Sequence, residues 1–307
     1  MAKHHKWRVR KEHDRYKLEK FLADRPELQT WSRRAIRRSL DRGEVSINGK
    51  VHRHAGDPVR QGQEVELHCF TQSATPDIKI IYENKDFIAV HKPAGVLSQP
   101  TTKQPAGHIT QLVQKVTASK QLCLCHRLDA ETSGLILLAK NQATAEAIFQ
   151  LFATRQIQKT YTAFVFGHPH HPQWCTEARL SRFDPKTQQV QILQKGPGNS
   201  KTLFELDKYY PHWNVSKLKC FPHTGKTHQI RVHLSSVGMP ILGDKIYSRH
   251  RPKSWPLAML QILSSQHFLH AERLQFKLAG KAYNLYCPEP DTFASLQRHL
   301  HQASSQR

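Results

Sequence analysis

One short segment near the middle of the chain holds the residues best suited to chemistry. Residues 126–134 read HRLDAETSG, in which a histidine and an arginine precede a single carboxylate, Asp129, and a polar turn with a glycine follows. Residues 135–139 (LILLA) are apolar throughout, as expected of a buried strand bounded by a turn. The pattern predicts a loop that presents Asp129 beside a buried strand. By itself, this carboxylate could serve catalysis or could only stabilise the turn, as many loop aspartates do.

The elements around this loop must position it. Apolar runs between turn signals predict strands at residues 78–81, 87–90, 122–125, 135–139, 159–165 and 204–221. Apolar residues at helical spacing predict helices at residues 109–116, from an N-cap at Asn141 through Ile157, at 230–237 and at 293–300. A chain of 307 residues is long enough for one large core and a small appended domain.

The charge balance indicates a polyanionic partner. Lys and Arg total 46 against 24 Asp and Glu, a formal net charge of +22. Such an excess favours nucleic acid, because each phosphate that is neutralised releases counterions. An anionic membrane is the alternative, but no apolar run approaches the roughly 20 residues of a membrane span and no basic amphipathic helix dominates. The basic start of the chain lacks the apolar centre of a signal peptide, so we expect a cytoplasmic protein.

Two patterns that suggest a bound metal or nucleotide fail on closer inspection. The HPHHP segment at residues 168–172 has interleaved prolines and no partner ligands at zinc spacing, which predicts a surface loop and no metal. Residues 224–227 (TGKT) resemble the end of a phosphate-binding loop, but Cys220 stands where that loop needs a glycine. The six cysteines include no Cys-x-x-Cys pair and are expected to be reduced and buried.

The N-terminal region has its own pattern. Residues 1–14 are basic and histidine-rich without periodicity, which predicts a flexible arm. Two short helices follow, and the second contains Arg33, Arg34, Arg37 and Arg38. Charge runs are usually solvated faces, but four arginines in six positions without an acidic neighbour argue against that interpretation, since a solvated face normally mixes charges of both signs. Asn48-Gly49 between alternating apolar residues predicts a hairpin.

Three segments resemble the motifs of the RluA-type pseudouridine synthases. Residues 126–140 match that family's signature, in which HRLD is followed by two free positions, TSG and an apolar strand. Residues 80–101 and 224–247 are similar to the flanking motifs, with Lys226 where the family often has arginine. Residues 15–67 resemble the S4 RNA-binding domain, which also ends in a hairpin of the V-x-I-N-G type. This resemblance implies that the arginine-rich helix, with Arg33, Arg34, Arg37 and Arg38, binds RNA.

The resemblance implies an α+β pseudouridine synthase fold with a largely antiparallel mixed sheet, preceded by a small α/β S4-like domain. The expected organisation is a basic flexible arm at 1–14, the S4-like domain at 15–70, a linker at 71–76, the catalytic domain at 77–290, and a C-terminal helix and tail at 291–307.

The resemblance also implies a reaction, in which a uridine in RNA becomes its C-glycoside isomer without a cofactor. Asp129 would be the essential group, either attacking C1′ or removing the C2′ proton, and these two routes stay open. Arg231 would pair with Asp129, and Tyr161 would stack on the uracil. Arg127 would fill the space left by the extruded uridine, while His126 would bind substrate or serve only structure.

The family leaves the target and one rival class open. An S4 domain favours large-subunit ribosomal RNA over transfer RNA. A non-catalytic RNA-binding or ribosome assembly factor is a rival, but it would have no reason to keep Asp129, Tyr161 and Arg231 together. A glycosylase would release free uracil. We expect a monomer whose partner is RNA, with no membrane and no nucleotide cofactor.

Overall fold

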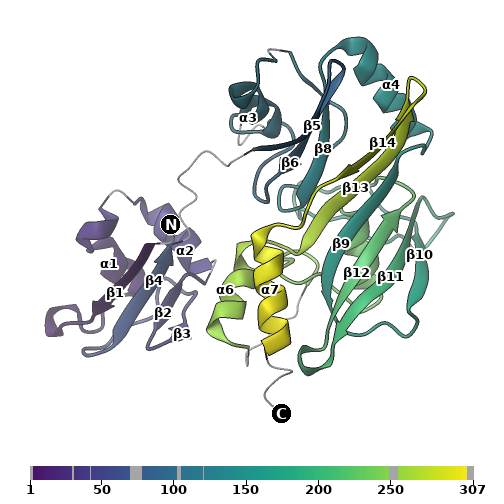
Figure 1. Cartoon of the computed structure of the whole chain (residues 1–307). Helices are drawn as coiled ribbons and strands as arrows, with labels where there is room; N and C mark the ends of the chain where they lie inside the picture. The colour runs from purple at the N-terminus through teal and green to yellow at the C-terminus, as the bar shows by residue number, and fades with distance from the viewer. Residues whose placement is uncertain are drawn as a thin grey trace. The chain divides into compact units, whose positions relative to one another are not determined.

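A computed structural model describes residues 3–29, 31–41, 43–69, 78–101, 105–119, 121–248 and 255–302. The chain divides into two compact units, the first formed by residues 1–75 and 252–265 and the second by residues 76–251 and 266–307 (Figure 1). Helix α6 (Leu257–Ser265) thus groups with the first unit, although we expected it in the catalytic domain. A contact between segments far apart in the chain leaves no local pattern. The linker expected at 71–76 lies outside the described residues.

The first unit contains a four-stranded antiparallel sheet in the order β1-β4-β2-β3. Its described strands are β1 (Lys3–Arg8), β2 (Val45–Ile47), β3 (Lys50–Val51) and β4 (Glu64–Cys69), and its other helices are α1 (Leu18–Ala23) and α2 (Arg33–Asp41). The two helices pack Phe21 and Ile36 into one core with the sheet. Asn48 and Gly49 have φ values of 49° and 76°, as the predicted hairpin requires.

Strand β1 corrects the expectation of a flexible arm at residues 1–14. It pairs along its whole length with β4, from Lys3 opposite Cys69 to Arg8 opposite Glu64. Lys6 Nζ lies 2.6 Å from a Glu64 carboxylate oxygen and 3.3 Å from one of Glu66. At least one basic residue of the expected arm, Lys6, is therefore paired across strands, and such pairing leaves no periodic signal in a six-residue segment.

The second unit is built on a ten-stranded mixed sheet within the described residues, in the order β10-β11-β12-β9-β13-β8-β6-β5, with β14 paired to β13 and β7 to β8. All pairings are antiparallel except β8 with β13. The strands are β5 (Lys79–Glu83), β6 (Phe87–Lys92), β7 (Cys123–Leu124), β8 (Ser133–Ala139), β9 (Gln158–Phe166), β10 (Gln173–Ala178), β11 (Ser200–Tyr210), β12 (Val215–Pro222), β13 (Leu269–Leu278) and β14 (Lys281–Tyr286).

Helices cover this sheet, and both faces of its centre are buried. The helices of this unit are α3 (Ile109–Val116), α4 (Gln142–Ala153), α5 (Gln229–Ser236) and α7 (Asp291–Gln302). Every residue of β8 is buried: Leu135 and Leu137 pack in one cluster with α4, and Ile136 and Leu138 in another with α3. This two-sided burial explains the continuous apolar run at 135–139.

Helix α4 begins as expected and ends early. The side chain of Asn141 accepts the N–H of Thr144 at 2.8 Å, which confirms the predicted N-cap. The helix ends at Ala153 rather than Ile157, because Arg155 adopts a left-handed conformation with a φ of 60°. Ile157 still enters the core, but as the residue that leads into β9. No helix in the described part of the chain is long and apolar enough to cross a membrane.

Gly134 explains how the central motif meets the rest of the sheet. It has a φ of 122°, and a Cβ added there would lie 2.3 Å from the carbonyl oxygen of Ala271 in β13. Only glycine permits this approach of two backbones. The parallel pairing of β8 and β13 at this point brings the loop before β8 beside β13 and its neighbour β9.

Candidate active site

The loop that presents Asp129 is held by short hydrogen bonds on both sides of the carboxylate. The Ser98 hydroxyl donates to the carbonyl of Leu128 at 2.7 Å and accepts the Leu128 N–H at 3.0 Å. The N–H of Thr132 donates to the carbonyl of Asp129 at 3.1 Å, which closes the turn. The backbone at Asp129 is therefore fixed by the protein before any substrate binds.

Lys92 also holds this loop, through hydrogen bonds to backbone carbonyls. Its side chain is fully buried, and Nζ donates to the carbonyls of Pro93, Val96 and Ala130 at 3.1, 2.7 and 2.9 Å. Burial lowers the pKa of Lys92 to about 7, while the three carbonyls match the three N–H groups of an ammonium ion. The lysine ties the loop after β6 to the loop of Asp129.

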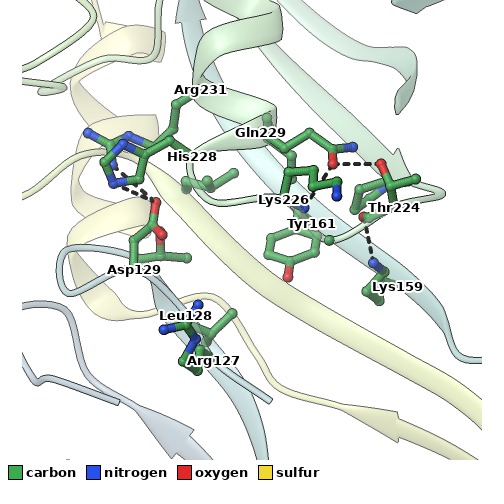
Figure 2. A pocket seen from close by; sticks show the side chains of 15 residues that line it. Arg127, Leu128, Asp129, Lys159, Tyr161, Thr224, Lys226, His228, Gln229 and Arg231 are labelled. Atoms are coloured by element: carbon green, nitrogen blue, oxygen red, sulfur yellow. Dashed lines mark hydrogen bonds and ion pairs between the residues drawn. The ribbon is translucent and has the colours of Figure 1, made fainter. Parts of the chain in front are cut away.

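Arg231 binds Asp129 from helix α5, as predicted. Its Nη1 donates to Asp129 Oδ2 at 3.0 Å (Figure 2). Its Nε and Nη2 donate to Asp244 at 2.7 and 3.0 Å. Asp244 is fully buried and also accepts the N–H groups of Ile246 and Tyr247. Asp244 therefore fixes the guanidinium so that one edge faces Asp129.

The pKa values of Arg231 and Asp244 follow from burial and charge. Burial alone would lower the pKa of Arg231, but its hydrogen bonds and charge attraction to Asp244 and Asp129 outweigh burial and raise it. Burial alone would raise the pKa of Asp244, but the guanidinium of Arg231 lowers it to about 2. Both groups are therefore charged throughout the physiological range.

Tyr161 lies in β9 and lines the same pocket as Asp129, Arg127 and Arg231 (Figure 2). Burial, and then the negative charge of Asp129, raise the pKa of the Tyr161 phenol above its ordinary value. The ring is therefore a neutral aromatic surface at the wall of the pocket.

The TGKT segment forms another wall of this pocket. Lys159 Nζ donates to the carbonyl of Thr224 at 2.8 Å, and Gln229 Oε1 accepts from the Thr224 hydroxyl at 2.6 Å and from the N–H of Lys226 at 3.1 Å. Burial lowers the pKa of Lys159 to about 8. These bonds hold the segment as a turn that leads into α5.

Arg127 and His126, which are adjacent in the HRLD motif, have different surroundings in the structure. Arg127 is exposed and lines the pocket, and its side chain forms no hydrogen bond or ion pair with the described residues. His126 lies away from the pocket: its Nε2 accepts the N–H of Leu137 at 3.1 Å and its ring packs on Phe152. Burial lowers the pKa of His126 to about 3. The geometry corrects the assignment of His126 to substrate binding, since its ring nitrogen is used by the backbone.

The arginines of α2 belong to the first unit. Arg33, Arg34 and Arg37 are exposed, and the side chain of Arg38 lies outside the described residues. Arg37 is paired with Glu19 of α1 through two hydrogen bonds of 2.9 and 3.0 Å. The face therefore has an acidic neighbour that the local sequence did not reveal, and Arg37 is less available to RNA than expected.

Comparison with known proteins identifies the family. The family model described as RNA pseudouridylate synthase matches residues 86–236, which include Asp129, Tyr161 and Arg231. The dual-specificity RNA pseudouridine synthase RluA of Pasteurella multocida is 32% identical over 213 residues, 69% of this chain and 92% of that protein. The chain belongs to the RluA-type RNA pseudouridine synthases.

Other comparisons agree with this family. The ribosomal large subunit pseudouridine synthase C of Rickettsia bellii is 28% identical over 280 residues, 84% of this chain and 90% of that protein. The solved structure of human RNA pseudouridylate synthase domain containing 1 has a TM-score of 0.61 and 24% identity, covering 75% of this chain and 90% of that chain. The predicted family and the α+β fold are confirmed. This RluA-type synthase isomerises uridine to pseudouridine in RNA.

The sequence analysis did not assign a role to three largely buried groups at this site. Lys92, His228 and Asp244 all stand within segments that resemble family motifs, but a motif does not say what each side chain contacts. Among the described residues, no three His, Cys, Asp or Glu side chains gather as metal ligands.

Proposed function

We propose that this pseudouridine synthase modifies specific uridines of large-subunit ribosomal RNA, flipping each target into the pocket where Asp129 performs the chemistry. The observation that carries the catalytic part is the Asp129–Arg231 ion pair in a pocket walled by Tyr161. The net charge of +22 and the similarity to the ribosomal large subunit pseudouridine synthase C of Rickettsia bellii support a ribosomal RNA target. Similarity to the mitochondrial tRNA pseudouridine(32) synthase of Saccharomyces cerevisiae makes transfer RNA the second candidate.

The reaction requires one bond to break and one to form. The N1–C1′ bond breaks, the uracil turns in the pocket, C5 joins C1′, and the proton that C5 loses is balanced by one gained at N1. Asp129 would either attack C1′ or remove the C2′ proton. Arg231 orients it by binding Oδ2, and Oδ1 accepts no hydrogen bond from the described residues. Oδ1 is therefore the oxygen available to the sugar, while Tyr161 keeps the turning base in one plane.

The target is tested by mapping pseudouridines in cells that lack this protein. We expect one or a few sites to disappear from large-subunit ribosomal RNA, and purified protein to restore them on an unmodified transcript. Loss confined to transfer RNA would reassign the target, and an unchanged map in both RNAs would overturn the proposal.

Arg127 offers a test of base flipping. If Arg127 occupies the vacated position in the stack, its loss should matter more where the target uridine is firmly stacked. Unstacking costs a few kcal/mol, and each 1.36 kcal/mol changes a rate tenfold. We expect Arg127→Ala to slow a uridine in a structured stem-loop at least about tenfold more than one in a flexible strand. Single-turnover rates on two RNAs that share flanking sequence measure this. Equal losses would make Arg127 a phosphate contact.

The first unit is proposed to bind RNA as an S4-like domain through α2. Arg33 and Arg34 are exposed and form no hydrogen bond or ion pair with described residues, which leaves them free for phosphates. Replacing both by Ala should weaken RNA binding and reduce its log–log salt slope by about 1.4 to 1.8, since each lost contact removes about 0.7–0.9. Arg37→Ala is the matched control, because Glu19 already neutralises that arginine. Slopes that change equally in both proteins would rule out this assignment.

A further inference from the structure

His228 stands at the start of α5 with two features that the reaction scheme does not yet use. It is the N-cap residue, and its backbone is left-handed, with a φ of 58° and a ψ of 12°. Its side chain is only one-tenth exposed and lines the pocket of Asp129 (Figure 2). A non-glycine residue in this conformation is uncommon and is often found at functional sites.

A chain of hydrogen bonds determines which ring nitrogen of His228 carries the proton. The N–H of Val190 donates to the Tyr247 hydroxyl oxygen at 2.7 Å, and that hydroxyl lies 2.8 Å from His228 Nδ1. Among the described residues, Nδ1 is the only hydrogen-bond acceptor for the proton of the Tyr247 hydroxyl. We therefore assign that proton to the bond with Nδ1, which places the proton of the neutral imidazole on Nε2.

This proton faces the catalytic carboxylate. His228 Nε2 lies 3.8 Å from Asp129 Oδ2, the same oxygen that accepts from Arg231 Nη1 at 3.0 Å. The gap exceeds a hydrogen bond by about 0.9 Å, and hydrogen bonds in an empty active site often tighten when substrate binds. The rings of Phe183 and Tyr247 meet the imidazole edge to face at 5.4 and 5.5 Å, so they limit its freedom to turn.

The surroundings keep this donor neutral. Burial lowers the pKa of His228, the positive charge of Arg231 adds to that effect, and Asp129 and Asp244 oppose it without reversing it. A neutral N–H can hold Oδ2 without adding a second positive charge beside a carboxylate that must react. An imidazolium would instead compete for the negative charge of Asp129.

We propose that His228 is a positioning residue for Asp129: its Nε2–H closes onto Oδ2 when a uridine enters, so that Oδ1 is the oxygen presented to the sugar. The proposal rests on the proposed catalytic role of Asp129. Arg231 and His228 then hold one oxygen from two directions, which leaves the carboxylate a single orientation.

Two substitutions of His228 separate this role from a purely conformational one. His228→Gln places an amide N–H at the distance of Nε2, whereas His228→Asn reaches only to the position of Nδ1. The left-handed backbone favours Asn over Gln. A positioning role therefore predicts that the Gln variant is the more active of the two, and a conformational role predicts the reverse order.

The measurement is the single-turnover rate with saturating protein, together with RNA affinity and thermal stability. A hydrogen bond to a charged group contributes about 1.5–3 kcal/mol, which corresponds to a loss of roughly 10- to 150-fold in His228→Asn. We expect His228→Gln to recover most of that loss, with RNA affinity unchanged in both. An Asn variant that matches or exceeds the Gln variant would overturn the inference.

Tyr247→Phe provides a second test that keeps the ring beside Arg231 and removes only the hydroxyl. It should slow the wild-type protein, whose imidazole proton then has no fixed position, but should have little further effect in His228→Gln, since an amide has no tautomer to select. Additive losses would contradict the proposed hydrogen-bond chain. The two proposals fail on different results. The proposed function fails if Asp129→Asn remains active. The inference about His228 fails if Asp129→Asn is inactive but the His228 or Tyr247 variants give the contrary results named above.

Discussion

We expect Asp129→Asn to lose pseudouridine formation by about 10³-fold or more, because an amide is neither a nucleophile nor a base at the sugar. The fold should survive the change. Asparagine keeps an oxygen that can accept from Arg231 Nη1, and Arg231 retains its two hydrogen bonds to Asp244. RNA affinity should be equal or slightly tighter, since the substitution removes a negative charge that faces a polyanion.

The comparison needs a control in the same loop. Glu131 lies two positions further on and forms no hydrogen bond or ion pair with the described residues, so Glu131→Gln makes the same charge change at a site without a proposed role. Single-turnover pseudouridine formation and RNA binding are measured for both variants. Turnover of Asp129→Asn within tenfold of wild type would show that another group performs the reaction.

Asp244→Ala should destabilise the second unit by about 3–5 kcal/mol, the usual effect of removing one partner of a buried ion pair. The substitution removes the two acceptor oxygens from the buried edge of Arg231. It also leaves the N–H groups of Ile246 and Tyr247 without the carboxylate that accepts their hydrogen bonds. Catalysis should also fall, because nothing then fixes the edge of Arg231 that binds Asp129. Hydrogen exchange of amides in β8 and β13 reports this free energy for the second unit by itself.

Asp184→Ala is the matched control for this prediction. Asp184 accepts the N–H of Lys186 and the hydroxyl of Thr187 in an exposed hairpin turn, so its loss should destabilise the protein far less than the loss of Asp244. A similar loss in both variants would mean that the Arg231 pair contributes little.

Acid unfolding provides an independent check on Asp244. Its pKa is lowered to about 2 in the folded protein, so its contribution is complete above the unfolded value of about 3.9 and is lost as the pH falls through about 2. The wild-type protein should therefore lose stability across this window. The part due to Asp244 should be missing from the profile of Asp244→Ala.

Local pattern was sufficient for the parts of this protein that depend on neighbouring residues. The apolar run at 135–139 identified a buried strand, Asn141 identified a helix N-terminus, and Asn48-Gly49 identified a hairpin. Each of these depends on backbone preference or on burial along one segment, which is written in consecutive residues. The resemblance of residues 126–140 then led to the family, which comparison confirmed.

Apart from the pairing of Arg231 with Asp129, which the family resemblance implied, tertiary structure decided which side chains contact one another. Glu19 forms an ion pair with Arg37. His126 accepts a backbone N–H, while Arg127 is exposed. Asp129 meets Arg231 across 102 positions of sequence, and Asp244 holds Arg231 from a turn beyond α5. Charge pairing and desolvation depend on distance in space, and they fall off within a few ångströms whatever the separation along the chain. The residues proposed to do the chemistry could therefore be named from sequence, but most of their partners and their protonation states required the fold.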